Sequence, residues 1–247
     1  MDPTKLSDVA CGDSVTIKTD SGEFIEGIVE NKLTKVHMHQ LGIKVILETG
    51  IVGRVQKIHP VVSERENILN LINEFHSNFR LDEGETLEFK ASMFYDLDIL
   101  EKTGKLSLFE KGPHSIAKTV AAFANQRGGV LYIGVRDAPR KIIGLKNDYS
   151  LLQYKKTADQ FLFKLKMSMD SSLSLYDFHQ CISVRKILCI DGEEICVLKI
   201  KPSKIPLRIK TKNGFEFYVR EADDSILYEN IQAFCTHWHE HMKELEG

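Results

Sequence analysis

Short runs of Val and Ile, separated by turn-forming residues, occupy the first sixty positions of the chain. The runs are VTIKT, FIEGIVENKL, IKVILE and GRVQKI, which begin at Val15, Phe24, Ile43 and Gly53. Turn signals lie between them, for example Asp20-Ser21-Gly22. Polar and apolar residues alternate in IKVILE, as they do in a sheet with one solvated face. The pattern predicts a small β-barrel in residues 1–60.

A helix is predicted to connect this barrel to the rest of the chain. In SERENILNLINEFHSNF, Ser63 and the glutamate three residues later have the spacing of a capping box. The apolar positions that follow at helical spacing are Ile68, Ile72, Phe75 and Phe79. With a boundary near Pro60, we expect a barrel at 1–60, a linking helix at 61–80 and a further domain at 81–247.

The further domain mixes helical and strand patterns. HSIAKTVAAFAN repeats apolar residues at helical spacing, and VLYIGV is apolar throughout, which is typical of a central strand covered on both faces. A second helix is expected over residues 158–169, and two hairpins turn at Asp191-Gly192 and Asn213-Gly214. The sequence therefore predicts an α+β fold, with a small N-terminal β-barrel followed by a mixed-sheet domain.

Composition limits the classes of function. The formal net charge of the 247 residues is −2, so any contact with nucleic acid must come from a local basic patch. No apolar run approaches the roughly 18 residues that a membrane span needs, and MDPTKLSDVACGD has no targeting pattern. The five cysteines form no CxxC pair, which predicts reduced thiols and a cytoplasmic location.

The candidate chemistry is concentrated in LDEGETLEFKAS. If LEFK is a strand, Glu88 and Lys90 share one face of it. A carboxylate beside a lysine is half of a metal-dependent phosphodiesterase site, since the acid can bind a hard cation and the lysine can offset phosphate charge. Glu83, Glu85 and Asp137 are further candidate ligands, because the two glutamates lie just upstream and the aspartate ends a neighbouring strand. A solvated strand with an ordinary Glu/Lys pair is the alternative.

An ordered set of motifs resembles the Schlafen AlbA-type domain, which is also described as a DNA-binding or divergent AAA-like domain. The motifs are EGETLEFKAS, KTVAAFANQRGGVLYIGVRD, IIGL, KPS-x-x-P-L and FYVR, and they extend from about Leu81 to about Trp238. The loop MFYDLDILEKTGKLSLFEKGP resembles the longer loop of many prokaryotic members. EADDS stands where many members have a Gly-Asn-Ser-like turn after FYVR.

This resemblance implies a site and an activity. In the ribonuclease branch of the family, three acidic residues and a lysine form a metal-dependent endoribonuclease site. The matching positions here are Glu83, Glu88 and Asp137 as ligands of Mg²⁺ or Mn²⁺, with Lys90 as the lysine. The N-terminal segment is similar to the small YwbE-like β domain through ENKLTK, GIKV and GRVQKI, and it resembles a KOW- or Tudor-like barrel.

One stretch, KIKPSKIPLRIKTK, is basic without an intervening acid. Its predicted nucleic-acid-binding residues are Lys204, Arg208, Lys210 and Lys212. An edge strand protected by charge is an equally good interpretation. Arg127 follows the AFAN helix and is a further candidate for phosphate contact. The glycine pair beside Arg127 lacks a phosphate-loop pattern and indicates a helix end.

Histidines offer little further chemistry. His237 and His241 are four residues apart, as in helical zinc sites, but no acidic base stands at the expected position. His37 and His39 fall in a predicted loop of the barrel, where solvated side chains are expected.

Three functions follow from these patterns. The first is a nucleic-acid-binding protein with metal-dependent endoribonuclease activity on structured RNA such as tRNA. The second is a non-catalytic module that binds RNA or DNA in regulation, and the third is an ATP-binding regulator. The enzyme interpretation requires that Glu83, Glu88 and Asp137 converge around one cation.

Finally, the C-terminal helix predicts assembly. An apolar stripe with 3/4 spacing comprises Tyr228, Ile231, Cys235, Trp238, Met242 and Leu245. The stripe either covers the sheet of its own chain or, if exposed, pairs two chains. Because one AlbA-type lobe offers only a short groove, we expect a homodimer.

Overall fold

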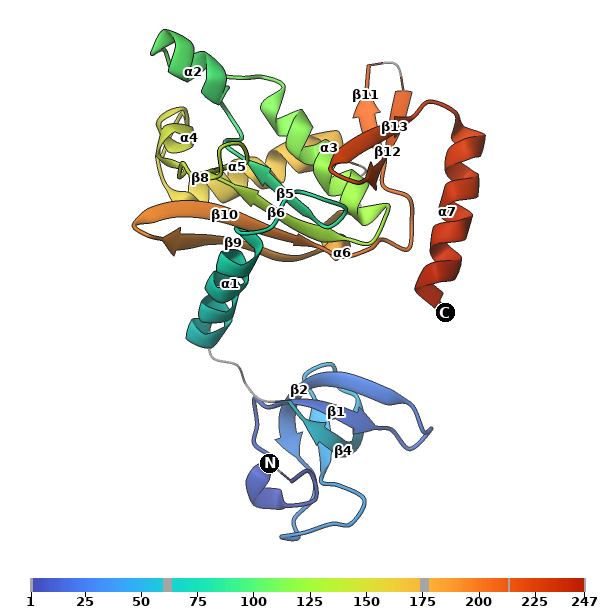
Figure 1. The fold of residues 1–247 in the computed structure, drawn as a ribbon. Coiled ribbons are helices and arrows are strands. Elements are labelled where there is room, and N and C mark those ends of the chain that lie inside the picture. The colour runs from blue at the N-terminus through green and yellow to red at the C-terminus, as the bar shows by residue number, and fades with distance from the viewer. Residues whose placement is uncertain (1, 60–63, 174–177, 213, 247) are drawn as a thin grey trace. The chain divides into compact units, whose positions relative to one another are not determined.

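The structure is a computed structural model that describes residues 2–59, 64–173, 178–212 and 214–246 (Figure 1). The chain divides into two compact units, Met1–Leu69 and Asn70–Gly247. The predicted boundary at Pro60, the capping residue Ser63 and the turn residue Asn213 lie outside the described residues.

The N-terminal unit contains a closed barrel of four antiparallel strands, which confirms the predicted β-barrel. A short 3₁₀ helix, η1 (Leu6–Asp8), precedes the barrel. The strands are β1 (Ser14–Lys18), β2 (Phe24–Lys32), β3 (Lys44–Leu47) and β4 (Val52–Ile58). Alternate apolar positions face inward because successive side chains of a strand point to opposite faces. The barrel core includes Val15, Ile17, Val29, Val45, Leu47 and Val55.

Helix α1 (Glu64–Asn78) forms where the sequence predicts a helix. From Asn70 onward it belongs to the C-terminal unit. Phe75 is fully buried, and its ring centroid lies 5.1 Å from that of Tyr132. The Asn78 side chain donates a 3.0 Å hydrogen bond to the Tyr132 hydroxyl. Phe75 and Asn78 thus attach the end of this helix to the central strand of the main sheet.

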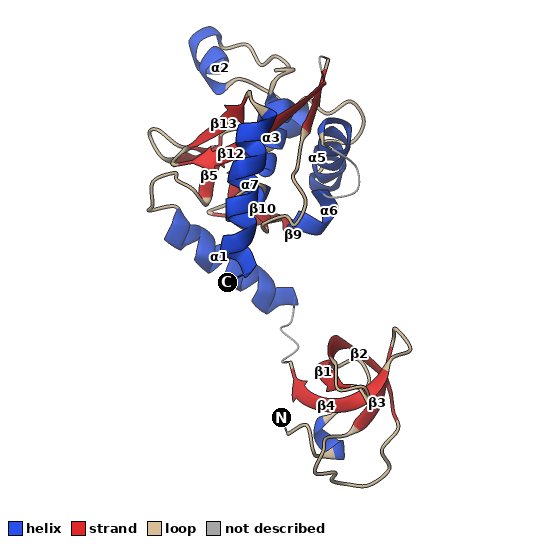
Figure 2. Cartoon of the chain, turned by 90° about the vertical axis from the view of Figure 1, so that its right-hand side faces the viewer, coloured by secondary structure: helices blue, strands red, loops and turns tan. Residues whose placement is uncertain are grey.

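The main sheet of the C-terminal unit has the strand order β5-β6-β10-β9 (Figure 1), and β5, β9 and β10 are labelled among the red strands of Figure 2. Its strands are β5 (Leu87–Lys90), β6 (Gly129–Ile133), β9 (Ile182–Ile190) and β10 (Glu193–Ile200). β5 runs parallel to β6, whereas β10 is antiparallel to both of its neighbours, so the sheet is mixed. The β9–β10 hairpin turns at Asp191 and Gly192, which have φ angles of 51° and 85°, as a type I′ turn requires.

Helices α3 (Gly112–Ala124) and α5 (Ala158–Ser172) share one hydrophobic core with the sheet. Leu131 and Ile133 of β6 belong to this core, whereas Tyr132 points to the opposite face, toward Phe75. β6 is therefore covered on both faces, as its uniformly apolar sequence predicts. The remaining short elements are α2 (Leu97–Thr103), β7 (Val135–Arg136), β8 (Lys141–Ile142), α4 (Lys146–Ser150) and α6 (Phe178–Cys181).

A second sheet with the order β11-β12-β13 lies beside α3 (Figure 1). Its strands are β11 (Ile209–Thr211), β12 (Gly214–Glu221) and β13 (Asp224–Tyr228), and helix α7 (Ile231–Glu246) follows them. The chain thus has a mixed α+β fold with a barrel at its N-terminal end, as predicted. Among the described residues, no helix is long and apolar enough to cross a membrane.

The buried face of α7 differs from the predicted stripe. Phe234 is 1% exposed, and its ring stacks on Phe217 of β12 with centroids 4.3 Å apart. Ile231 is 53% exposed and Cys235 is also exposed, so the alternative in which the stripe covers the sheet of its own chain is wrong for these two residues. The side chain of Leu245 lies outside the described residues. Dimerisation through the exposed part of the stripe stays a prediction.

Candidate functional site

Glu88 of β5 is buried and paired with two cations. Its side chain is 4% exposed, and Oε1 forms an ion pair with Lys90 Nζ. The second oxygen, Oε2, accepts a 2.5 Å hydrogen bond from the Arg220 guanidinium. Glu88 and Lys90 therefore share a face of the strand, as predicted, but the alternative of a solvated strand is wrong for Glu88.

Arg220 of β12 connects this strand to the second sheet. It is 1% exposed, and its Nε donates a 2.9 Å hydrogen bond to the carbonyl of Gly84. The guanidinium also lies 5.2 Å from the ring centroid of Phe123 on α3. Sequence reasoning did not select Arg220, because an arginine that ends the FYVR motif has no local signal of burial.

The pKa of Glu83 depends on the charges of the other two acids. Its Oε1 accepts a 2.6 Å hydrogen bond from the backbone N–H of Phe89. Burial, together with the negative charges of Glu88 and Asp137, raises the pKa of Glu83 to about 7, although the Phe89 N–H and Lys90 oppose the shift. The predicted acids and lysine thus form one electrostatic neighbourhood, the acidic network of Glu83, Glu88, Lys90 and Asp137.

Asp137 is held by a nearby arginine. Its Oδ1 accepts a 2.6 Å hydrogen bond from Arg140, whose guanidinium stacks 3.9 Å from the ring centroid of Phe89. Arg140 also donates a 2.8 Å hydrogen bond to the carbonyl of Leu81. Arg140 therefore joins Asp137 to the residues around β5, and it is a second arginine that the motif pattern did not identify.

The acidic network does not fit a divalent cation as its side chains stand. Mg²⁺ and Mn²⁺ need several free oxygen ligands around one point, but Glu88 is bound to Lys90 and Arg220, and Asp137 is bound to Arg140. Across the described residues, no group of three or more His, Cys, Asp or Glu side chains is placed to hold a metal ion. Metal binding by Glu83, Glu88 and Asp137 stays a prediction, and it requires these cationic side chains to move away.

The predicted basic residues lie on the outer side of a segment around β11. This basic segment comprises Lys204, Arg208, Lys210 and Lys212, all of which are exposed. Leu207 and Ile209 are fully buried, so Lys210 of β11 points outward by strand geometry. Within the described ranges, none of the four forms an ion pair. Arg208 instead stacks on the exposed ring of Phe215, 4.1 Å from its centroid.

Arg127 has a different setting. Its guanidinium is 3.2 Å from Glu85 in an exposed ion pair, with 60% of the arginine side chain accessible. It lines an open groove of about 380 Å³ along β5, β6 and β10, together with Glu74, Asn78 and Lys199. Lys199 of that groove is itself paired with Glu74. The charges of this groove are therefore largely balanced.

Asn125 fixes the basic segment to the end of α3. It is fully buried and donates hydrogen bonds of 2.7 and 2.9 Å to the carbonyls of Leu207 and Tyr218. Its own oxygen accepts a 2.7 Å hydrogen bond from the Leu207 N–H. Gly128 ends the turn after α3 with a φ of 76°, and a Cβ there would lie 2.5 Å from the carbonyl oxygen of Ile200. The glycine pair therefore serves close packing after a helix end, as predicted.

The histidines have structural partners. His237 is 2.9 Å from the side-chain oxygen of Gln126, and its ring lies beside that of Tyr228. His39 contacts the Arg54 guanidinium at 3.2 Å within the barrel. The side chain of His241 lies outside the described residues.

Asp148 of α4 is a buried carboxylate that sequence reasoning did not select. Its Oδ1 accepts hydrogen bonds of 2.9 and 2.8 Å from the backbone N–H groups of Met93 and Phe94. Burial raises the pKa of Asp148 to about 7 despite these bonds. Asp148 holds the start of the loop that follows β5 and thereby supports the position of that strand.

Both units match families of known proteins. A family described as Schlafen, AlbA_2 matches residues 83–229, which is more than half of the chain. A family described as an uncharacterized conserved protein, DUF2196, matches residues 2–58. The first match includes both the acidic network and the basic segment.

Individual relatives are distant. An uncharacterized ATP-binding protein of Ureaplasma parvum serovar 3 is 32% identical over 127 residues, which cover 51% of this chain and 30% of that protein. The crystal structure of the DIP2311 protein from Corynebacterium diphtheriae has a TM-score of 0.45 at 13% identity, covering 72% of this chain and 28% of that one. This chain therefore spans less than a third of the length of either protein.

Proposed function

The chain belongs to the Schlafen AlbA_2 family, and from this premise we propose that it binds nucleic acid through the basic segment. One observation carries the proposal: four exposed cations, unpaired within the described residues, lie along residues 204–212, and Arg208 among them stacks on the exposed ring of Phe215. Lysine and arginine contact phosphates, and an exposed ring such as Phe215 can stack on a base.

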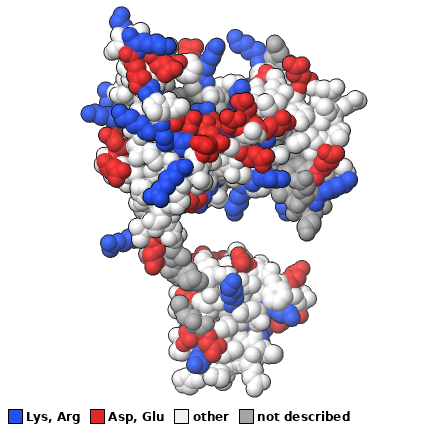
Figure 3. Space-filling model, viewed as in Figure 1, with Lys and Arg blue, Asp and Glu red and all other residues white. Residues whose placement is uncertain are grey.

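The distribution of charge supports a local contact. Acidic and basic side chains are interspersed over the face in Figure 3, in line with a net charge of −2. A protein of this kind has no long-range basic field, so a segment without acids is the region where phosphates meet the least repulsion. From Lys199 to Asn213 the chain contains five lysines and one arginine and no acid.

Replacing Lys204, Arg208 and Lys210 with alanine is expected to weaken RNA binding and its salt dependence together. Each phosphate contact to a single strand contributes about 0.7 to the slope of log affinity against log salt concentration, so losing three should lower the slope by about two. The measurement is fluorescence anisotropy of a labelled 20-nucleotide single-stranded RNA over a series of salt concentrations.

A matched control is available on the same unit. Lys146, Lys155 and Lys156 are also exposed, and their replacement with alanine removes the same net charge elsewhere. We expect this control to keep the wild-type slope. Equal slopes for the two triple variants would show that the basic segment is not the contact surface.

A metal-dependent endoribonuclease acting on structured RNA such as tRNA is the second candidate function. Glu83, Glu88, Lys90 and Asp137 share one electrostatic neighbourhood, and this observation favours it. Loaded with Mg²⁺ or Mn²⁺, such a site would supply Lewis-acid chemistry at a phosphodiester. The ion pairs of Glu88 and Asp137 count against it until they are shown to open.

Folded tRNA incubated with the protein and Mn²⁺ separates the two candidates. An endoribonuclease would give fragments that disappear with a chelator and in Glu83→Gln, because glutamine keeps the acceptor for the Phe89 N–H but loses the charge. Glu83 is preferred to Glu88 for this test, since Glu88 is part of a buried ion pair. Intact tRNA under conditions of full binding would leave binding as the function.

A further inference from the structure

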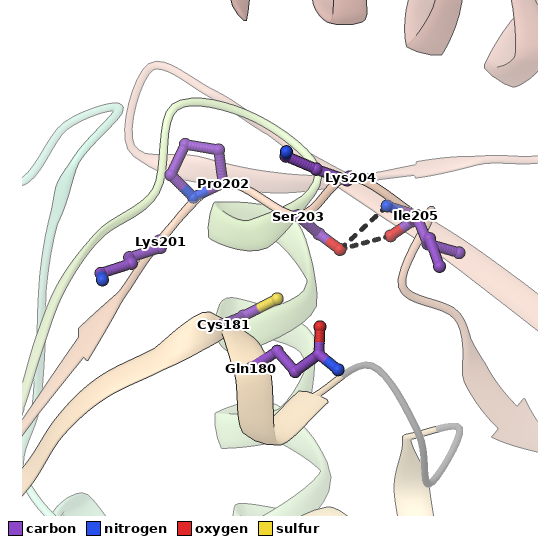
Figure 4. Close-up of a pocket in the computed structure, with 7 residues that line it drawn as sticks. All are labelled: Gln180, Cys181, Lys201, Pro202, Ser203, Lys204 and Ile205. Carbon is purple, nitrogen blue, oxygen red and sulfur yellow. Dashed lines mark hydrogen bonds between the residues drawn. The ribbon is translucent and has the colours of Figure 1, made fainter. Parts of the chain in front are cut away.

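A pocket of about 210 Å³ opens beside the basic segment (Figure 4). One side is formed by Gln180 and Cys181 at the end of α6, and the other by the loop of residues 201–205 that follows β10. This loop is the KPS-x-x-P part of the family motif and leads directly into β11. The acidic network takes no part in this pocket.

The pocket is held in shape by backbone hydrogen bonds. The N–H of Lys201 donates to the carbonyl of Cys181 at 2.7 Å, and the N–H of Ser203 donates to the carbonyl of Ala124 at 2.8 Å. The Ser203 hydroxyl donates to the Ile205 carbonyl at 2.5 Å and accepts from the Ile205 N–H at 3.2 Å, as the dashed lines in Figure 4 show. The loop is therefore already ordered, and binding of a ligand would cost little conformational entropy of the protein.

The walls are mostly apolar, with one amide. Cys181, Pro202 and Ile205 present sulfur, a ring and an aliphatic side chain, and Ile205 is 55% exposed although it sits in a tight turn. In the part of the chain that the structure describes, the side-chain amide of Gln180 forms no hydrogen bond. An amide offers both a donor and an acceptor, which suits the edge of a nucleobase.

Two lysines flank this apolar pocket. Lys201 and Lys204 are both exposed, and both line the pocket. Neither forms an ion pair with another described residue. Apolar walls alone would suit many ligands, but apolar walls with two ammonium groups that form no ion pair among the described residues suit a flat base that carries phosphate.

We propose that this pocket receives one nucleotide, with the base between Pro202 and Ile205, the base edge on Gln180, and phosphates on Lys201 and Lys204. The inference deepens the proposed nucleic-acid binding, because an unpaired nucleotide of a bound strand has this chemistry. A free mononucleotide has it too. A base inside a duplex does not reach such a pocket unless it leaves the stack.

The test uses a variant that removes base contacts without changing charge. Gln180→Ala with Ile205→Ala alters two exposed side chains, and Gln153→Ala with Tyr154→Ala is the matched control on another exposed loop. The probes are a 12-nucleotide single-stranded RNA, the same sequence as a duplex, and AMP. We expect the pocket variant to lose about tenfold in affinity for the single strand, the size of one base contact, with an unchanged salt slope.

Affinity for the duplex and the control variant should match the wild type. If the wild type binds AMP and the pocket variant does not, the ligand of the pocket is a free nucleotide. If the wild type binds the single-stranded RNA but not AMP, the ligand is a nucleotide within a strand. If the basic-segment variant weakens RNA binding and the pocket variant does not, the pocket inference is wrong and the proposed function stands. If the wild type binds no RNA, the proposed function is wrong. The pocket inference then depends only on whether the wild type binds AMP and the pocket variant does not.

Discussion

Arg220→Met is expected to lower the free energy of unfolding by about 3–5 kcal/mol, because it leaves a buried carboxylate without its main partner. Arg220 is 1% exposed and is bound to Glu88, whose side chain is 4% exposed. Methionine fills similar space but offers no charge and no donor to Glu88 or to the Gly84 carbonyl. Native proteins typically have a free energy of unfolding of about 5–15 kcal/mol. The expected loss is a large part of this value and should be measurable by urea denaturation followed by circular dichroism.

Arg127→Met is the matched control. Arg127 is also paired with a glutamate, Glu85, but its side chain is 60% exposed, so the change should cost about 0–1 kcal/mol. The double variant Glu88→Gln/Arg220→Met should lose less than the sum of its two single changes, because the partners share one interaction. Strict additivity, or an Arg220→Met protein as stable as the control, would contradict the assignment of this pair to the core.

Phe234→Ala is expected to release α7 from the second sheet at a cost of about 3–5 kcal/mol, the usual range for removing a buried phenyl ring. Phe234 is 1% exposed and stacks on Phe217, with Tyr228 at 5.9 Å. The readouts are thermal unfolding and hydrogen exchange of the helix amides. Faster exchange confined to residues 231–243 would show that the helix detaches before the rest unfolds.

Ile231→Ala tests the alternative register of α7. If the predicted stripe were the buried face, this change would be the costly one. Because Ile231 is 53% exposed, we expect a loss within about 0.5 kcal/mol. A larger loss for Ile231→Ala than for Phe234→Ala would restore the predicted stripe.

Local patterns predicted the elements of the fold well. The strands of the barrel and the Asp191-Gly192 turn depend on alternation and on positive φ angles, which neighbouring residues determine. The outward position of Lys210 in β11 follows from the same alternation. These features need no information from distant parts of the chain.

The partners of the acidic network could not be predicted in this way. Arg220 and Arg140 contact Glu88 and Asp137 only because the sheets and loops bring them together. The register of α7 has the same origin, since a helix with apolar residues on several sides is oriented by the surface that it meets. Phe234 occupies the buried position because it packs against the rings of Phe217 and Tyr228.

The pairing of Glu88 with Arg220 has a consequence for synthesis. The two residues are 132 positions apart in the chain, so a ribosome that adds about 5–20 residues per second needs roughly 7–26 seconds to make the second after the first. During that interval the Glu88 carboxylate has only Lys90 as a cationic partner, which opposes its burial in the sheet. We therefore expect the burial of β5 in the main sheet to be completed only after β12 has emerged.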